Sequence, residues 1–346
     1  WRTRDELRQT FIPLGDGSLR PNDSYDLVRT TRTIGLSGFA TAGVNYADLH
    51  ELDFTTMFLR QTEDEAVEQI GFNLDEDGII RFNELEWEER ELFTMQVEGA
   101  HVFPLLNSAR LEWDYSDSAA ALSTPDSRRY RYDPDDEAGF IFSRRADSNI
   151  RRYTTLDDEA IDYGADFEIP FEAGDWLAAK LKVGYRNVDK ERQSTIRRFT
   201  FEDISNISEE DRRSQSLEDI LTPENIGPDG ARLLEITRNS DNYSAALDIE
   251  AYYANLDFTL WERLRIAGGV RVEDWAQNVR TFSLFEEDTV ESESNLGDED
   301  LFPAASLTWF ITENQQLRVS YAETIIRPDF KELSDSPFTD PILERE

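Results

Sequence analysis

The side chains most capable of binding an ion lie in one short loop between positions 73 and 84. Four of them occupy positions 1, 3, 5 and 12 of a calcium-binding loop: Asn73, Asp75, Asp77 and Glu84. Gly78 takes position 6, where such a loop turns sharply. Oxygen ligands at this spacing could surround one Ca²⁺. However, position 1 is Asn rather than Asp, a strand is expected after the loop, and 73 carboxylates in the chain make a chance match easy. The favoured interpretation is an acidic, solvated loop, with calcium binding as the alternative.

Charged side chains also crowd two longer stretches. The stretch 117–152 holds the arginines Arg128, Arg129, Arg131, Arg144, Arg145, Arg151 and Arg152. They could contact lipopolysaccharide phosphates or an anionic ligand through bidentate pairs. The neighbouring acids Asp133, Asp135, Asp136 and Glu137 could equally pair with them, which is the favoured interpretation. The stretch 281–302 is acidic and has no basic residue, and we interpret it as a solvated run rather than a cation-attracting loop.

No residue pattern for catalysis is present. The chain has no G-x-S-x-G elbow, no P-loop, no Rossmann glycines and no H-E-x-x-H sequence. Without cysteine, a thiolate nucleophile or a thiolate metal site is excluded. His50 and His101 are the only histidines, and a place at a rim or in a lumen is favoured over a shared metal ion. The chain is therefore not expected to be an enzyme, and no cofactor other than calcium is predicted.

Composition narrows the class of protein further. Asp and Glu number 73 against 36 Lys and Arg, a net charge of −37, which argues against a nucleic-acid partner because phosphate binding needs a basic surface. Aromatic residues at 12% are too many for a disordered acidic tail. No apolar stretch approaches the ~20 residues that a membrane helix needs. A β-barrel remains compatible, because its strands alternate and their average hydropathy is low.

The elements that carry these residues alternate apolar and polar side chains with the period of a strand. In 181–186, Leu181, Val183 and Tyr185 oppose Lys182, Gly184 and Arg186. The same alternation occurs around 110–115, 244–253, 263–272, 305–312 and 317–322. Alternation alone does not decide whether the apolar face meets a dry core or lipid.

The connections between strands decide between these two cases. Short links are expected at 47–50, 104–107, 172–175, 255–260 and 312–315, and long polar stretches at 62–82, 117–152, 187–241 and 276–301. Short and long connections thus alternate, as tight periplasmic turns and long extracellular loops do in outer-membrane barrels. Structureless loops of this length are uncommon in soluble domains. Five tryptophans are expected in interfacial girdles: Trp87, Trp113, Trp261, Trp275 and Trp309.

Several fragments resemble one family. Gly268–Glu273 reads GGVRVE, and the C-terminal third contains Phe302–Phe310, Glu313–Tyr321 and Ile326–Leu333. With Arg327-Pro328-Asp329-Phe330 as their most specific part, these segments resemble the late barrel strands of TonB-dependent receptors. Trp87–Glu91 and Gly99–His101 resemble an early strand of the same barrels.

The resemblance implies an all-β fold, an antiparallel up-and-down transmembrane β-barrel with short periplasmic turns and long extracellular loops. We expect about ten strands of a larger barrel of 22. Residues 1–346 would be part of one barrel domain, with the plug domain and the C-terminal strands absent.

The family implies a place in the outer membrane of a Gram-negative bacterium, in contact with its lipid and lipopolysaccharide. It also implies uptake of a scarce ligand such as a siderophore, cobalamin or an oligosaccharide. Energy would come from an inner-membrane TonB complex acting through the plug. The alternative is a soluble extracellular all-β binding protein or glycan-active enzyme, in which Leu181 and Val183 would face a dry core.

Overall fold

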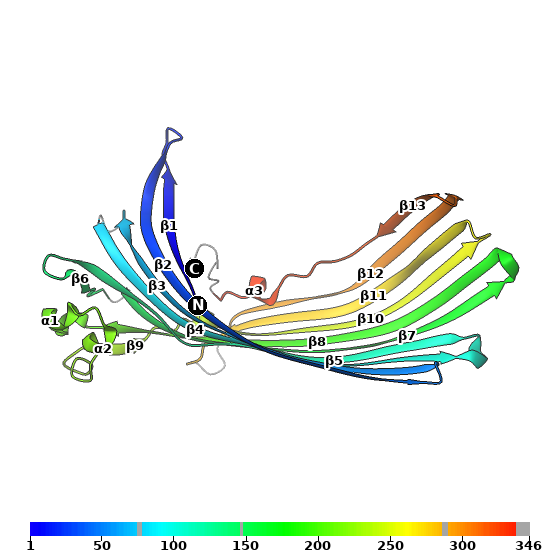
Figure 1. Cartoon of the computed structure of the whole chain (residues 1–346), viewed down its shortest axis with the longest axis horizontal. Coiled ribbons are helices and arrows are strands. Elements are labelled where there is room, and N and C mark those ends of the chain that lie inside the picture. Colours follow the sequence, from blue (N-terminus) through cyan, green and yellow to red (C-terminus); the bar gives the residue numbers. More distant parts are fainter. Residues whose placement is uncertain (75–77, 146–147, 286–289, 337–346) are drawn as a thin grey trace.

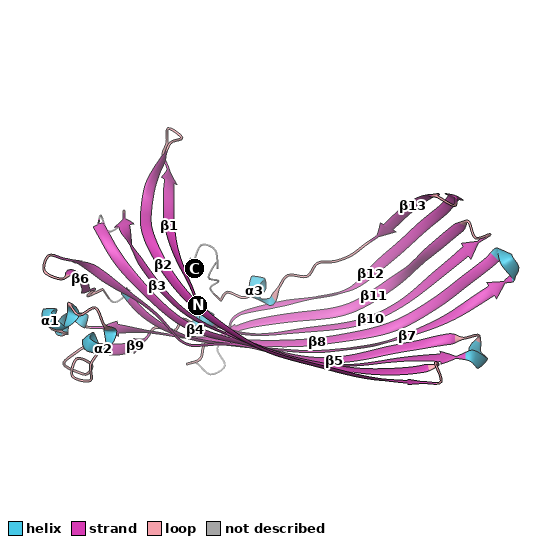
Figure 2. Ribbon diagram, in the orientation of Figure 1, coloured by secondary structure: helices cyan, strands magenta, loops and turns pink. Residues whose placement is uncertain are grey.

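The computed structural model describes residues 1–74, 78–145, 148–285 and 290–336. They form one antiparallel sheet whose long strands follow one another in chain order, and the sheet is open and curved (Figures 1 and 2). The strands are β1 Arg2–Pro13, β2 Leu19–Tyr46, β3 His50–Asn73, β4 Gly78–Phe103, β5 Ala109–Asp135, β6 Gly139–Phe142, β7 Asn149–Ala173, β8 Leu177–Glu202, β9 Arg232–Glu235, β10 Asn242–Leu260, β11 Leu264–Phe282, β12 Val290–Thr312 and β13 Gln315–Ala322. β6 pairs with β5 and β9 with β8, beside the main path.

The helices are single turns at strand ends or in connections. They are η1 Pro104–Leu106, η3 Gly174–Trp176, η4 Ile204–Asn206, α1 Glu209–Arg212, α2 Leu217–Ile220, η5 Asn239–Asp241 and α3 Phe330–Leu333. Within the described ranges, no helix is long and apolar enough to cross a membrane.

Tight turns gather at one end of the sheet, on the right in Figure 1. Several contain non-glycine residues with a left-handed backbone: Ala47, Asp48, Asn107, Ser108, Trp261 and Glu262. The predicted turn at 255–260 is wrong, because β10 continues to Leu260 and the chain turns at 261–263. Neighbouring turns are tied together, since the Trp261 N–H donates to the Trp176 carbonyl at 2.9 Å.

The long polar stretches are mostly strand rather than loop, which corrects the prediction. β3 and β4 stay paired from His50 opposite His101 out to Asn73 opposite Gly78, so 62–82 is a ladder with a short tip. The segments 117–135 and 187–202 are likewise continuations of β5 and β8. The strict alternation of the band is lost there, although one face of β2, β3 and β4 still buries a cluster of Tyr25, Leu27, Val67 and Ile80. Backbone pairing needs no such alternation.

One face of the sheet carries an apolar band, and we call it the outer wall. On β8 the outward residues are Leu177, Ala179, Leu181, Val183 and Tyr185, followed by Asn187 and Asp189. β10 repeats the pattern from Leu260 to Tyr252 before Glu250. β11 runs from Leu264 to Val272 before Asp274. Each band is nine residues long, which is the length of a tilted strand that spans a bilayer.

Aromatic rings mark both edges of this band. At the far edge the rings of Tyr163, Tyr185 and Tyr252 follow one another across β7, β8 and β10, with centroids 6.2 and 5.0 Å apart. At the edge near the tight turns, Trp176, Trp261 and Trp309 are exposed. Aromatic girdles of this kind lie at the two interfaces of membrane barrels. The girdle prediction holds for Trp261 and Trp309 and is wrong for Trp275, which faces the other wall and donates to Asp300 at 2.8 Å.

The strands therefore form part of a transmembrane β-barrel, as predicted, although with more strands than the expected ten. The sheet has thirteen in the part of the chain that the structure describes, eleven of them on the main path. The rows of apolar side chains face lipid, and the alternating polar rows face the interior, which we call the inner wall.

Replacing an outward residue in the middle of the band should block assembly. Leu181→Arg places a charge near the bilayer centre, where it costs ~2–4 kcal/mol. Ala267→Arg makes a matched control, because Ala267 lies in the middle of the β11 band but on the inner wall, opposite Asp257. We expect heat-modifiable migration on gels to be lost for Leu181→Arg and kept for Ala267→Arg. Equal behaviour of the two variants would reverse our assignment of the walls.

Candidate functional site

Ion pairs cover the inner wall along the membrane-spanning part of the strands. Lys182 Nζ lies 2.7 Å from Asp166, and Lys180 Nζ lies 3.0 Å from Glu168. Arg186 reaches both Asp162 at 2.7 Å and Asp114 at 3.2 Å. These pairs join β5, β7 and β8 side by side, so the wall is charged yet locally neutralised.

Glycines on the inner wall allow long side chains to lie flat across neighbouring strands. Tyr253 of β10 lies over Gly184 of β8, and its hydroxyl donates to Asp166 of β7. A Cβ atom at Gly184 would overlap the Tyr253 ring. Two open grooves of about 420 and 570 Å³ lie beside this network, and Gly269, Ala304 and Ala322 line both of them.

A segment after β13 crosses the inner wall and is held there by side chains from three strands. We call residues 323–336 the crossing segment; α3 lies within it, in the concavity of the sheet (Figure 1). Arg327 Nη2 lies 2.6 Å from Glu273 of β11, and Arg192 Nη1 of β8 lies 3.3 Å from Asp329. Gln277 of β11 donates to the Pro328 carbonyl at 2.9 Å.

Phe330 fixes the crossing segment by burial. Its side chain is 3% exposed and packs against Tyr243, Ala245 and Val279. The Arg192 guanidinium lies 5.3 Å from the centre of the Phe330 ring, within the range of a cation–π contact. Each functional group of the Arg-Pro-Asp-Phe sequence thus has a partner on the wall. Those partners were not predicted, because no local pattern connects positions 192 and 329.

At the end of the strands away from the tight turns, residues 203–241 fold into a lobe. Its apolar core joins lobe residues to side chains from β5, β6 and β8: Tyr130, Tyr132, Phe142, Phe201, Ile204, Ile207, Ile220 and Ala231. Burial raises the pKa of Tyr132 to about 12, which keeps the phenol neutral within this core. Buried Arg212 ties the lobe to β6 through a 2.9 Å hydrogen bond to the Phe142 carbonyl.

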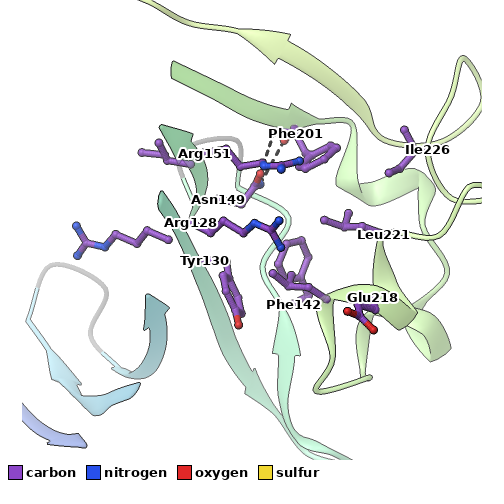
Figure 3. Close-up of a pocket in the computed structure, with 12 residues that line it drawn as sticks. Arg128, Tyr130, Phe142, Asn149, Arg151, Phe201, Glu218, Leu221 and Ile226 are labelled. Carbon is purple, nitrogen blue, oxygen red and sulfur yellow. Dashed lines mark hydrogen bonds between the residues drawn. The ribbon is translucent and has the colours of Figure 1, made fainter. Parts of the chain in front are cut away.

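A cavity of about 200 Å³ lies between the lobe and the strands (Figure 3). Aromatic and aliphatic side chains line it, among them Tyr130, Phe142, Phe201 and Leu221. Arginines and one acid add charge to the lining: Arg128, Arg129, Arg151 and Glu218. A cavity of this size could hold one small ring.

The arginines of 117–152 pair largely with carboxylates, although mostly with acids other than the predicted ones. Of the predicted acids, Asp133 pairs with Arg131, whereas Asp135 and Glu137 pair with Arg213 of the lobe. Asp126 accepts hydrogen bonds from Arg128 at 2.8 Å and from Arg151 at 2.7 Å. Burial alone would raise the pKa of Asp126, but the hydrogen bonds from these two arginines outweigh it and lower that pKa. Arg131 pairs with Asp133 at 2.6 Å, and Arg144 with Glu209 at 2.6 Å.

Acidic residues face one another where β3 and β4 continue beyond the band. Glu63 lies opposite Glu88, and Glu65 lies opposite Glu86. Burial raises the pKa of Glu65 and that of Glu88, and the charges of Glu63 and Glu86 raise both further. Arg29 lowers the pKa of Glu65 and Arg90 that of Glu88, but burial outweighs them. No group of three or more acidic or histidine ligands positioned for a metal ion occurs within the described ranges.

The calcium-loop residues are only partly described. Asp75 and Asp77 lie outside the described residues. Asn73 ends β3 opposite Gly78 and donates to the Tyr25 hydroxyl at 2.9 Å, whereas Glu84 lies on β4 opposite Val67. Six residues of strand, about 20 Å, therefore separate Asn73 from Glu84 along the ladder. The calcium site stays a prediction, which calorimetry with millimolar Ca²⁺ would test.

One family model and several solved structures are similar to this chain. Residues 100–345 match the family model described as TonB dependent receptor-like, beta-barrel. No curated protein matches the chain. Among solved structures, the siderophore receptor PiuA from Acinetobacter baumannii is 12% identical, with a TM-score of 0.44, over 86% of this chain and 47% of that chain.

Two further solved receptors are similar to the same extent. The ferric-catecholate import receptor Fiu from E. coli K12, in its closed form, is 11% identical, with a TM-score of 0.45, over 84% of this chain and 49% of that one. The alcaligin outer membrane receptor FauA from Bordetella pertussis is 15% identical, with a TM-score of 0.43, over 87% of this chain and 43% of that one. The chain thus spans about half the length of these receptors.

The lipid-facing band with its aromatic edges and the charged inner wall define a membrane β-barrel of the outer-membrane type. The family match extends over well over half of the residues. The chain belongs to the TonB-dependent receptor β-barrel family.

Removing the Phe330 ring should detach the crossing segment. Phe330→Ala leaves a cavity among Tyr243, Ala245 and Val279, and such changes cost about 3–5 kcal/mol. Ile326→Ala is the matched control, because Ile326 lies in the same segment and is 95% exposed. Limited proteolysis of the folded protein should cut within 323–336 only in Phe330→Ala. Equal protection in both variants would show that Phe330 does not hold the segment.

The acidic cluster gives a pH dependence with a defined sign. A carboxyl whose pKa is higher in the folded state binds protons more readily there, so stability falls as pH rises above its ordinary value near 4.5. Glu88→Gln should therefore raise the urea midpoint at pH 8 and lose this advantage near pH 4. Exposed Glu224 supplies the control, Glu224→Gln. A gain for Glu88→Gln that does not depend on pH would contradict the assignment.

Proposed function

We propose that the protein works as a TonB-dependent receptor that carries a scarce ligand across the outer membrane of a Gram-negative bacterium. The 346 residues form part of one barrel domain of that receptor. A siderophore, cobalamin or an oligosaccharide is the class of ligand, and an inner-membrane TonB complex supplies energy through a plug domain. The barrel has no catalytic role.

The observation that carries this proposal is the family match over 100–345. The two walls of the sheet support it, because an apolar band with aromatic edges fits lipid and a polar wall fits a wet interior. The rival, a soluble all-β binding protein, would place Leu181 and Val183 in a dry core. They are instead 37% and 42% exposed on the outer wall.

The lobe and its cavity are the parts of this chain best placed to meet a ligand from outside the cell. They lie at the end of the strands opposite the tight turns, which face the periplasm in this family (Figure 1). The lining of Tyr130 and Phe142 offers ring surfaces, and Arg128 and Arg151 offer donors. Outer-leaflet lipid and lipopolysaccharide are the partners of the outer wall.

Uptake assays in matched strains test the proposal. The full-length receptor would be produced in an E. coli strain that lacks its own siderophore and cobalamin receptors, with and without tonB. Radiolabelled ferric catecholate, ferric hydroxamate, cyanocobalamin and maltodextrin would serve as probes. We expect accumulation of at least one probe, only in the tonB-positive strain.

Two results would contradict the proposal. Accumulation that is equal without tonB would remove energy coupling from the mechanism. Recovery of the protein in the aqueous fraction, rather than with outer membranes, would favour the soluble rival. The assembly-defective Leu181→Arg variant gives the background level of each probe.

A further inference from the structure

The cavity beneath the lobe lies against the outer wall of the sheet and not against its interior. Every second residue of β8 after outward Tyr185 points the same way, and Phe201 of the cavity lining is one of them. Arg198 points to the opposite wall, where it bonds Asp241 at 3.1 Å. The Asp241 carbonyl also accepts from Ser336 of the crossing segment, which lies on the inner wall. The cavity is therefore reached from the flank of the barrel rather than through its wet interior.

Lipid does not reach this cavity, and its volume limits the size of an occupant. Phe201 lies sixteen residues beyond Tyr185, the far edge of the apolar band on β8, or about 50 Å of strand. An occupant therefore comes from the aqueous side. The volume is about 200 Å³, and a dry protein cavity of about 150 Å³ takes up benzene. One six-membered ring with a small charged substituent fits.

The lining favours an aromatic ring over a sugar ring. Tyr130, Phe142 and Phe201 present rings, and Leu221 of the lobe faces them (Figure 3). Asn149, the one amide side chain in the lining, is already bonded to the backbone of Phe201. Its Oδ1 accepts from the Phe201 N–H at 2.8 Å, and its Nδ2 donates to the Phe201 carbonyl at 3.4 Å. The hydroxyl groups of a sugar would find few partners here, and burying them without partners costs free energy.

Two arginines give the cavity a positively charged edge. Arg128 of β5 lies opposite Arg151 of β7, and both donate to the carboxylate of Asp126. Each uses its Nε and Nη2 hydrogens for this, so neither Nη1 has an acceptor within the described part of the chain. Two positive charges and one negative charge leave one net positive charge. Arginines held in this way suit a planar carboxylate.

We propose that the cavity binds a small aromatic acid, with its ring between the lobe and the strands and its carboxylate on Arg128 and Arg151. A neutral ring or a sugar acid matches only half of this site. Glu218, the one acid in the lining, is exposed on the lobe, so solvent screens its repulsion. The site lies outside the interior of the barrel, and the proposal does not depend on which ligand the receptor takes up.

Ligand-observed NMR titrations of the folded, full-length receptor in detergent test the proposal. The probes are benzoate, benzyl alcohol as the neutral ring, acetate as the acid without a ring, and glucuronate as the sugar acid. We expect saturable binding of benzoate and roughly tenfold weaker binding of each other probe, because each lacks one part of the match. Absence of saturable benzoate binding up to ~10 mM would overturn the proposal. Equal affinity for benzyl alcohol or glucuronate would do the same.

Variants separate this site from general effects of charge. Arg128→Gln should weaken benzoate binding roughly ten- to a hundredfold, because it removes a hydrogen bond between charged groups. Arg129→Gln is the matched control, since the Arg129 guanidinium lies over the Phe82 ring of β4, 4.9 Å from its centre, on the inner wall. Leu221→Trp should fill the cavity and abolish benzoate binding while heat-modifiable migration is kept. Equal losses in Arg128→Gln and Arg129→Gln would place benzoate elsewhere and overturn the proposal.

Discussion

Lipid offers no hydrogen bonds, and this constraint determines most of the structure. Every backbone N–H and C=O within the bilayer must be paired inside the protein, which only helices and closed sheets can achieve. Here an antiparallel ladder, in which each long strand joins the next along the chain, provides this pairing for the strands that have a neighbour on both sides. Because that ladder fixes which side chains point to which wall, the nine-residue apolar band and the charged interior arise from the same register.

The inner wall shows how charge is tolerated within such a sheet. Lys182, Arg186 and their acid partners are joined in pairs across neighbouring strands, each of modest worth because the wall is wet. Their combined effect is geometric, since glycines such as Gly184 let long side chains span strands without displacing the backbone. The crossing segment uses the same wall as its anchor, through Arg192 and Glu273.

The alternation of apolar and polar residues predicted the lipid-facing side of the strands. It did not predict contacts between residues that lie far apart in the sequence. The alternation at Leu181, Val183 and Tyr185 gave the correct outward face, because every second side chain of a membrane-spanning strand faces lipid. It failed in 62–82, where β3 and β4 extend beyond the lipid-facing band and the strict alternation is lost although the ladder continues. The contacts of Asp329 with Arg192 and of His50 with His101 join residues 137 and 51 positions apart. No spacing within a strand can indicate such pairs.

In the orientation proposed above, the ladder beyond the band lies at the cell surface and affects how that surface is recognised. β3 runs fifteen residues past Phe58, the last apolar outward residue of its band, to Asn73, or about 50 Å of paired strand. An antibody or a bacteriophage protein that approaches from outside therefore contacts hydrogen-bonded strands rather than flexible loops. Its epitope would combine side chains from adjacent strands, such as Asp64 and Trp87, which lie opposite each other on the outer wall. A peptide copied from one strand would not reproduce it.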